Sequence, residues 1–462
     1  MYRPYTRAPF DSACCTGCGE CFHQCPVMRL PLPEARAEIE RLRAMDQGSG
    51  AMDGDPSSIV LRNCTSCLAC NQVCPEECRP ANLVLDLWHA AYLREGLPAR
   101  AAWFLPHARP NFRTYILDRL PGDERQAVAR WRQGGPAREF LYAGCNLVTT
   151  PYLTFSRLFE GLEIRGGLDY CCGEMLFRMG LYEAVEQVAR RLTLWFGQLG
   201  AERVYLVCTA GLNLLRNVLP QFGADFGGIE FLPFQQILLE RLRSEGYWGL
   251  SRKHETCHAE RGDAPCSTAF RAHAEIPRSL RSLGMTAPEQ PSARPPYRSV
   301  TVQDSCHART VAPGFCDLPR QVLEACGVEV REAPGHGDTQ LCCGIGGGFA
   351  HASAYDPFRL LLAARRTSRE HRQMPADATC VYCSGCLEMM SSARFVDPSR
   401  RPVVHLLEIV QWAMGETPRR RQGTLARQFL AGALRNQFPS LMSRERFWLP
   451  DIPPEPDPAE AR

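Results

Sequence analysis

The stretch Cys15-Thr-Gly-Cys18-Gly-Glu-Cys21-Phe-His-Gln-Cys25-Pro26 decides most of what this sequence predicts, because the chain repeats its pattern as Cys64-Thr-Ser-Cys67-Leu-Ala-Cys70-Asn-Gln-Val-Cys74-Pro75. Both copies have the spacing C-x2-C-x2-C-x3-C-P. Thiolates at this spacing hold [4Fe-4S] cubanes in pairs. Three of them wrap one cluster, and the fourth, turned away by the proline, reaches the neighbouring cluster. The repeat therefore predicts two cubanes near the start of the chain.

The predicted ligand sets are crossed between the two copies. Cubane 1 is expected on Cys15, Cys18, Cys21 and Cys74, and cubane 2 on Cys64, Cys67, Cys70 and Cys25. A zinc knuckle or a disulfide framework is the alternative. Tetrahedral zinc needs two CxxC-like pairs and gains nothing from two identical quartets that end in proline. We therefore expect an α-helical, two-cluster ferredoxin-type domain over residues 1–90.

Composition predicts a soluble protein of a reducing compartment. The chain has 462 residues and 24 cysteines, and the cysteine spacing is that of metal sites, which need reduced thiolates. No apolar run approaches the roughly 20 residues that cross a bilayer, and no signal peptide is visible. We expect a cytoplasmic protein whose membrane association is only peripheral, through a partner. The net charge of +3 is not gathered into a stripe, so nucleic-acid binding has no support.

Beyond a helical connector expected over residues 91–135, one unit occurs twice. The first unit (136–250) contains a strand from Glu139 to Cys145, a helix Leu153–Leu162, the run Cys171-Cys172-Gly173 and a strand Val204–Val207 leading to Cys208. The second unit (298–415) contains a strand Ser299–Cys306, a helix Leu318–Cys326, a strand Val328–Glu332, the run Cys342-Cys343-Gly344 and the run Cys383-Ser-Gly-Cys386. Equivalent cysteines are 161, 171 and 175 residues apart, which indicates a duplication with changes in loop length.

Strands and helices alternate in both units, and the cysteines follow strands. This pattern predicts α/β units with ligands at the carboxyl ends of the strands. The expected fold class is a multidomain α/β and α+β protein. Residues 251–297 are expected as a polar linker, and residues 416–462 as a basic amphipathic tail, in which Arg419–Arg421 precede apolar residues at helical spacing. Such a tail could pack on its own domain, dock a partner or lie on an anionic membrane surface.

The second unit offers more thiolates than a cubane can use. Its five cysteines are Cys306, Cys342, Cys343, Cys383 and Cys386. A cubane has four irons that each take one external ligand, so either one cysteine is spare or the cluster is unusual.

This order of motifs, a cysteine, then CCG, then CxxC, resembles the duplicated cysteine-rich domain of heterodisulfide reductase catalytic subunits. The same module occurs in the iron-sulfur subunits of glycolate oxidase and anaerobic glycerol-3-phosphate dehydrogenase. The resemblance covers nearly the whole chain. In heterodisulfide reductases five such cysteines hold a non-cubane [4Fe-4S] cluster at which a disulfide is cleaved by one-electron steps. The resemblance thus implies that the five cysteines of the second unit hold a non-cubane cluster and that this cluster is the catalytic site.

The first unit departs from this pattern, because Gly211 stands where the fifth cysteine is expected. The cysteines that remain are Cys145, Cys171, Cys172 and Cys208. Four thiolates suffice for a cubane or an altered non-cubane cluster. The first unit could therefore hold a fourth iron-sulfur cluster, or it could be a relic that holds none.

Several further residues are candidates for roles near the clusters. Gly344, Gly346 and Gly347 are expected to let the backbone pass close to a cluster and donate N–H groups to its sulfides. His307 and His336 are candidate proton donors for a thiolate product, with an ordinary core or surface histidine as the alternative. Cys380 falls outside the motifs and is expected to be a packed thiol, but it is also a candidate ligand because it lies three residues before Cys383. The string His254-Glu-Thr-Cys-His258 matches the zinc-protease motif, but its polar surroundings favour a chance occurrence.

The leading functional hypothesis is an iron-sulfur oxidoreductase subunit of heterodisulfide reductase type. Two cubanes would pass electrons to the cluster of the second unit for disulfide or thiol redox chemistry. The alternative is an electron-transfer subunit that links a flavin-dependent dehydrogenase, of glycolate, lactate or glycerol-3-phosphate type, to the quinone pool. A structural zinc protein is a third reading. The chain has no flavin or NAD fingerprint, so the expected partner is a flavoprotein dehydrogenase or a membrane b-type cytochrome or other quinone-reactive subunit.

Overall fold

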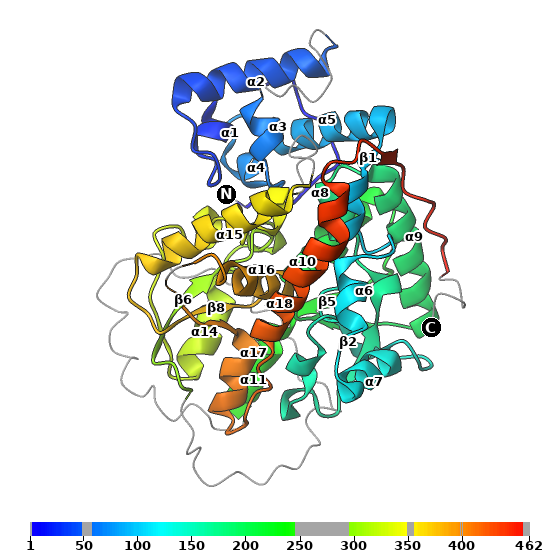
Figure 1. Ribbon diagram of the computed structural model, residues 1–462, viewed down its shortest axis with the longest axis vertical. Coiled ribbons are helices and arrows are strands. Elements are labelled where there is room, and N and C mark those ends of the chain that lie inside the picture. Colours follow the sequence, from blue (N-terminus) through cyan, green and yellow to red (C-terminus); the bar gives the residue numbers. More distant parts are fainter. Residues whose placement is uncertain are drawn as a thin grey trace.

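The computed structural model describes residues 2–48, 58–244, 295–348, 355–397, 399 and 401–455. The protease-like string at 254–258 and most of the expected linker lie outside the described residues. A small helical region formed by the N-terminal residues lies at one end of the molecule, above two larger α/β lobes (Figure 1). The predicted combination of helices with parallel sheets is confirmed.

Each lobe is built on a four-stranded sheet in which all strand pairs are parallel. The first sheet contains β2 (Glu139–Ala143), β3 (Glu163–Gly166), β4 (Arg203–Leu206) and β5 (Glu230–Pro233), in the order β3-β2-β4-β5. The second sheet contains β6 (Ser299–Gln303), β7 (Glu329–Val330), β8 (Ala378–Val381) and β9 (Val403–His405), in the order β7-β6-β8-β9. In both sheets the second strand along the chain lies at one edge and is followed by the first, third and fourth strands. The two units that are duplicated in the sequence therefore share one topology.

This strand order explains where the cysteines lie. In each sheet the chain leaves the first strand for one edge and then returns to the other side of that strand. Loops diverge at such a switch point and leave a crevice at the carboxyl ends of the strands. Cys145 and Cys208 follow the two strands that flank the switch point in the first sheet, and Cys306 and Cys383 do so in the second.

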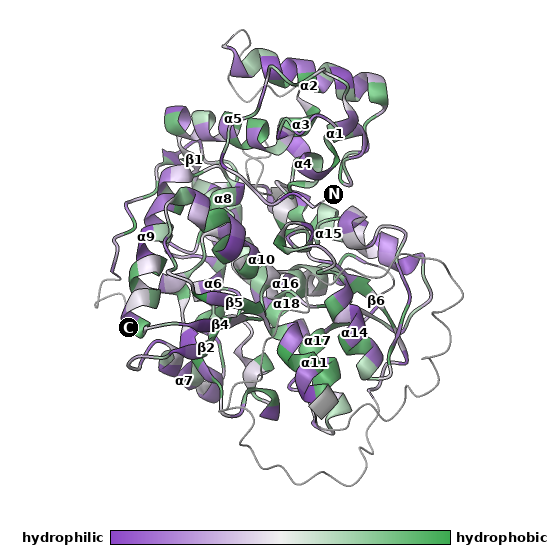
Figure 2. Cartoon of the chain, turned by 180° about the vertical axis from the view of Figure 1, so that it is seen from behind, coloured by the Kyte–Doolittle hydropathy of each residue, from purple (hydrophilic) through white to green (hydrophobic). Residues whose placement is uncertain are grey.

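The helices of the two lobes cover the sheets and meet between them. Those of the first lobe are α8 (Glu174–Arg178), α9 (Tyr182–Leu199), α10 (Thr209–Asn213) and α11 (Phe234–Ser244). Those of the second are α13 (Ala308–Val311), α14 (Asp317–Ala325), α15 (Pro357–Arg372), α16 (Ser384–Ala393) and α17 (Leu406–Ala413). Every residue of α10 and of α16 is buried, and Figure 2 shows both helices in the interior of the molecule.

The cluster region is helical, and its last helix, α5, packs against the first lobe. Its elements are α1 (Glu20–His23), α2 (Leu32–Asp46), α3 (Ile59–Asn63), α4 (Ala69–Val73) and α5 (Pro80–Glu95). Helix α5 runs through residue 90, the expected end of this domain. A β-carbon at Gly180 would lie 2.7 Å from the Leu85 oxygen, so the glycine allows the first lobe to pack directly on α5.

The connector forms helices, and its first element pairs with the C-terminal segment. Its elements are β1 (Leu97–Pro98), η1 (Ala99–Phe104), α6 (Phe112–Leu117) and α7 (Gly122–Trp131), and β1 pairs antiparallel with β10 (Arg446–Phe447). This pairing ties the end of the chain to the start of the connector.

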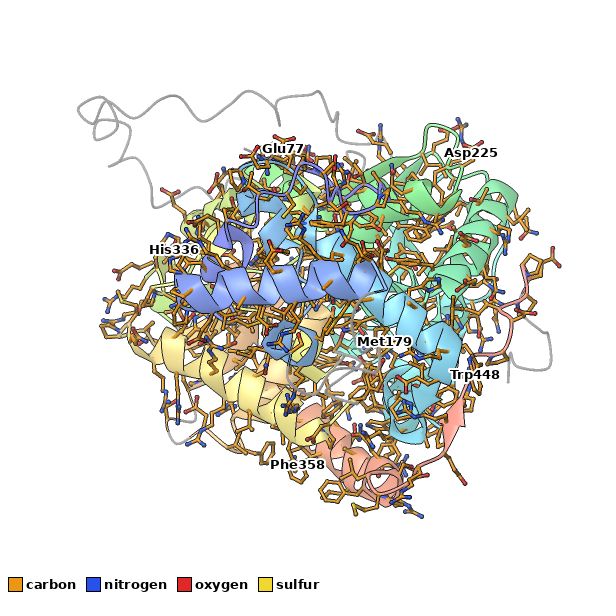
Figure 3. The ribbon with its side chains drawn as sticks, turned by 90° about the horizontal axis from the view of Figure 1, so that it is seen from above. Glu77, Met179, Asp225, His336, Phe358 and Trp448 are labelled. Atoms are coloured by element: carbon orange, nitrogen blue, oxygen red, sulfur yellow. The ribbon has the colours of Figure 1, made fainter. Side chains whose placement is uncertain are left out.

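The basic C-terminal segment packs on the protein itself. Helix α18 (Gln422–Gly432) buries Leu425 and Phe429, and the ring of Phe429 lies 5.3 Å from that of Phe112. Arg421 forms an ion pair of 2.8 Å with the buried Glu124. Beyond α18, Phe438 contacts Phe358 at the start of α15, which Figure 3 shows beside this segment. The tail is therefore part of the folded body rather than a free docking helix.

One local prediction is wrong, and a second is right in type but too long. A helix was expected over Leu153–Leu162, but the structure has two 3₁₀ turns, Pro151–Thr154 and Arg157–Phe159. The hydroxyl of Ser156 accepts a hydrogen bond from the Leu158 N–H and so starts a new turn instead of continuing a helix. The expected strand Val328–Glu332 is paired only at Glu329 and Val330. In the part of the chain that the structure describes, no helix has both the length and the apolar character for crossing a bilayer.

Candidate functional site

The four cysteines predicted for cubane 1 come together from both copies of the motif. Cys15, Cys18, Cys21 and Cys74 line one small cavity, together with Glu76. Burial raises the pKa of the Cys21 thiol, and so do the neighbouring thiols of Cys74 and Cys15. Cys74, the last cysteine of the second copy, thus lies with the first three cysteines of the first copy.

The cubane 2 set shows the reciprocal exchange. Burial raises the pKa of Cys25 to about 11, and the next cause is the thiol of Cys67. Burial also raises the pKa of Cys70, which interacts with Cys64, Cys21, Cys67 and Cys25. The interaction of Cys70 with Cys21 places the two sets next to each other.

Equivalent backbone turns shape both motif loops. The second and fourth residues after the first cysteine have positive φ in each copy: 70° at Gly17 and 78° at Gly19, and 46° at Ser66 and 60° at Leu68. Glycine adopts this conformation freely, whereas a leucine there is strained. The turn brings the N–H of Ser66 to 3.3 Å from the Cys64 sulfur. Both loops therefore keep a conformation that curls backbone N–H groups around sulfur.

The five cysteines of the second unit converge in the interior. Their residues are all buried: Cys306, Cys342, Cys343, Cys383 and Cys386. Thiol hydrogen bonds join Cys306 to Cys342, and Cys386 to both Cys343 and Cys383. The bond from Cys306 holds the pKa of Cys342 well below its usual value. Cys380 points elsewhere and contacts the Val381 oxygen, so it is not part of the group.

Glycines after the CC pair shape the wall of this group. Gly344 has φ of +108°, and a β-carbon there would lie 2.5 Å from the Ala364 nitrogen. A β-carbon at Gly346 would lie 2.8 Å from the Thr65 oxygen in the cubane 2 loop. Gly347 continues the same 3₁₀ turn, Ile345–Gly348. The glycine run is thus needed where the second unit approaches both α15 and the cluster region.

The four cysteines of the first unit are gathered less tightly. The sulfurs of Cys145 and Cys171 are 3.2 Å apart, and Cys171 also contacts Cys172. Cys208 is hydrogen-bonded to Cys383 of the second unit. Gly211 has no side chain to complete this set, and a β-carbon added there would lie 3.3 Å from the Leu206 side chain.

The contact between Cys208 and Cys383 shows that the two units face each other, because these cysteines hold equivalent positions. The Asn213 amide lies 3.2 Å from His307 Nδ1, and Thr149 of the first unit is hydrogen-bonded to Glu388 of the second. Burial raises the pKa of Glu388 to about 7. The carboxyl ends of both sheets therefore share one polar interior.

Of the two candidate histidines, only His307 lies in this interior. Its Nε2 is 3.0 Å from Glu174 Oε1 and 3.0 Å from the Arg178 guanidinium. Burial opposes ionisation of Glu174, but Arg178 and His307 outweigh it and lower the pKa of that carboxyl. His336 is exposed at the edge of the molecule, where Nδ1 contacts the Ala333 oxygen (Figure 3).

Three buried arginines that were not predicted from the sequence lie against the thiol sets. Arg178 donates to Cys306 Sγ at 2.7 Å and to the Thr65 oxygen at 2.9 Å, and it pairs with Glu174. Arg309 donates to Cys67 Sγ at 3.7 Å. Arg113 is buried beside Cys145 and Cys171. Of the three, only Arg178 could have been singled out in the sequence, because it is the one charged residue within the apolar run Met175-Leu-Phe-Arg178-Met.

These features fit iron-sulfur clusters. Thiolates are the soft ligands such clusters require. The buried guanidinium groups would balance the negative charge of a thiolate-bound cluster, because a buried charge needs a counter-charge. In addition, the N–H of Cys78 donates to Cys74 Sγ at 3.4 Å. Within the described ranges no three His, Cys, Asp or Glu side chains are grouped as for a single metal ion.

Comparison with known families agrees with this division of the chain. Residues 8–75 match the 4Fe-4S dicluster domain, and residues 142–214 and 300–391 each match the cysteine-rich domain.

Three named relatives are each 22% identical to the chain. They are the EtfAB:quinone oxidoreductase of Syntrophomonas wolfei (73% of this chain, 48% of the relative), the probable iron-sulfur-binding oxidoreductase FadF of Bacillus subtilis (81% and 56%), and one subunit of the dihydromethanophenazine:CoB–CoM heterodisulfide reductase of Methanosarcina barkeri (87% and 93%). The chain thus spans about half the length of the first two relatives and nearly all of the third.

Proposed function

Because this chain belongs to the iron-sulfur oxidoreductases that join a 4Fe-4S dicluster domain to two cysteine-rich domains, we propose that it is an oxidoreductase subunit of heterodisulfide reductase type. It would pass electrons through two [4Fe-4S] cubanes to a cluster in its second cysteine-rich domain, for disulfide or thiol redox chemistry. The ligands proposed for the cubanes are the two crossed sets of four cysteines. Those proposed for the third, non-cubane cluster are the five cysteines of the second unit.

One observation carries this proposal: the cubane 2 loop adjoins the five-cysteine group directly. Arg178 touches both, with Nη1 on the Thr65 oxygen and Nη2 on Cys306 Sγ. Arg309 makes a second bridge, from Cys67 Sγ to the oxygen of Gln340, two residues before Cys342. A cubane region packed against the five-cysteine group is what electron delivery to that group requires.

The protein's own residues would prepare this group for thiol chemistry. A bound iron-sulfur cluster supplies electrons one at a time. Arg178 neutralises negative charge at Cys306, and Glu174 holds Arg178 in place through their ion pair. His307 is the proposed proton donor to a thiolate product, because its Nε2 lies in the same polar interior. All five cysteines are buried, which limits their contact with bulk water.

The alternative role is electron transfer between a flavin-dependent dehydrogenase and the quinone pool. Gly211 favours it, because the first unit has four cysteines and so lacks a second five-cysteine group. The similarity to a quinone oxidoreductase points the same way. In either role a flavoprotein dehydrogenase or a membrane b-type cytochrome is the proposed partner, at the cytoplasmic face of the membrane. A fourth cluster on Cys145, Cys171, Cys172 and Cys208 is proposed for the first unit.

Replacing Cys386 with serine tests the leading proposal. The variant should lose disulfide reduction driven by a reduced viologen, while electron paramagnetic resonance still detects both cubanes. Cys380→Ala is the matched control, since it removes a buried thiol of the same segment that lies outside the five-cysteine group. Undiminished disulfide reduction by Cys386→Ser would contradict the proposal and leave the electron-transfer role.

A further inference from the structure

We propose that the buried Arg309 raises the reduction potential of cubane 2 above that of cubane 1, so that electrons run inward, from cubane 1 to cubane 2 and on to the second cysteine-rich domain. This inference rests on the proposed function only for the two cubane ligand sets. In the step concerned, reduced cubane 1 loses one electron and oxidised cubane 2 gains it. No bond is formed or broken, and no proton moves.

Arg309 brings a positive charge to cubane 2 that no carboxylate neutralises directly. Its side chain comes from α13 of the second unit and is buried, with 4% of the residue exposed. Nη1 lies 3.7 Å from Cys67 Sγ, and Nη2 donates to the Gln340 oxygen at 2.7 Å. Nε has no partner. Among the residues that the structure describes, Arg309 forms no ion pair; the thiolates of Cys67 and Cys306 act on it more strongly than the exposed carboxylate of Asp338.

A second buried guanidinium adds to this charge only in part. Arg178 donates to the Thr65 oxygen in the loop between Cys64 and Cys67. Its charge is offset by Glu174, whose Oε1 lies 2.5 Å from Arg178 Nε. The surplus positive charge next to cubane 2 is therefore that of Arg309.

The surroundings of cubane 1 differ in both charge and exposure. Arg3 donates to the Cys74 oxygen at 2.6 Å, but it is paired with Glu77 at 3.1 Å. Arg43, the cation that acts on Cys15, is paired with Glu40 at 2.9 Å near the surface. Arg36 donates to the Cys18 oxygen at 3.3 Å from an exposed position. Paired or hydrated charges of this kind have weak effects, because solvent screens them.

Reduction adds one negative charge to a cubane, so a nearby cation stabilises the reduced form. The stabilisation is greatest where the effective dielectric constant is low, as around Arg309. Net charge and hydrogen bonds to the sulfurs are established determinants of cluster potentials. Arg309 meets both conditions at cubane 2, and no buried, unpaired cation among the described residues does so at cubane 1.

A redox titration followed by electron paramagnetic resonance tests the inference without any substrate. In the wild-type protein, cubane 2 should be reduced first. In Arg309→Gln the ratio of reduced cubane 2 to reduced cubane 1 should fall at least tenfold, which is about 59 mV for a one-electron couple. Arg309→Lys should restore much of the difference, because it keeps the charge. Arg36→Gln is the control and should leave both potentials nearly unchanged.

Assignment of the signals comes from Cys67→Ser, which alters or removes the cubane 2 spectrum alone. Iron and sulfide contents equal to wild type show that Arg309→Gln has kept its clusters. Equal potentials in the wild-type protein, or a higher potential at cubane 1, would overturn the proposed direction. Potentials that do not respond to Arg309→Gln would overturn the role of this residue. Absence of two cubanes would instead refute the proposed function.

Discussion

Replacing Arg178 with methionine should destabilise the protein by about 3–5 kcal/mol, the range for breaking a buried ion pair by removing one partner. The arginine is 1% exposed, so its replacement leaves the Glu174 carboxylate without its main counter-charge. It also leaves the Thr65 oxygen without a donor. His307 Nε2, 3.0 Å from Glu174, can compensate in part, which places the expected loss toward the lower end of the range.

The loss can be measured as a shift in melting temperature under anaerobic conditions. With an unfolding entropy of about 2.1 cal/mol/K per residue, a chain of 462 residues has about 1 kcal/mol/K. A loss of about 3 kcal/mol then lowers the melting temperature by about 3 °C if the whole chain melts as one unit. The shift is several times larger if the second lobe melts first, because fewer residues share the same loss.

A double-mutant cycle separates the ion pair from simple packing. Glu174→Gln combined with Arg178→Met removes both charges, so it should be less destabilising than Arg178→Met alone. A double variant that loses the sum of the two single losses would refute the reasoning, because it would show no coupling between the two residues. An unchanged melting temperature in Arg178→Met would refute it as well.

Three further predictions concern pH, a backbone turn and the C-terminal helix. Burial raises the pKa of Glu408 to about 7, so ionisation of this one group should lower the free energy of unfolding by roughly 3 kcal/mol as the pH rises from 4.5 through 7. In thermal scans Glu408→Gln should remove this part of the pH dependence, and a variant whose profile runs parallel to that of the wild type would contradict the prediction. Gly344→Ala should lower the melting temperature more than Gly415→Ala, because both glycines have positive φ but only Gly344 lies against the backbone of a neighbouring helix, α15. Equal decreases would contradict this prediction, because they would show that the added methyl group at Gly344 does not clash with α15. Leu425→Ala should lower the free energy of unfolding by about 2–5 kcal/mol and Leu434→Ala by less than about 0.5 kcal/mol, because Leu425 is buried and Leu434 is exposed. Similar melting temperatures for the two variants would mean that α18 is not packed.

The repeated motifs predicted the parts of the fold that depend on local spacing. Cys25 and Cys74 were expected to exchange between the two loops, and the structure places each with the other copy's cysteines. The duplication was visible because strands, helices and cysteines recur in the same order in both units. The shared strand order of the two sheets agrees with it.

Predictions failed where a side chain or a neighbouring element competes with local propensity. The apolar residues around Leu153 and Leu162 suited a helix, but the Ser156 hydroxyl starts a separate turn. For the tail beyond Arg419 the sequence left docking and packing open, and the contacts of Phe429 with Phe112 and of Arg421 with Glu124 favour packing. Amphipathic character alone does not identify the surface that a helix covers.

The sequence by itself predicted the two cubane sets, because three of the four cysteines in each set follow one another at intervals that a short loop can wrap. Only the tertiary structure decided how the sets relate. It brought Cys208 of the first unit against Cys383 of the second, and it carried Arg309 from the second unit to Cys67 in the cluster region. The two residues of each pair are far apart in the chain, so no local sequence pattern predicts their contact. They form because the carboxyl ends of two parallel sheets and one cluster loop are packed around the same buried interior.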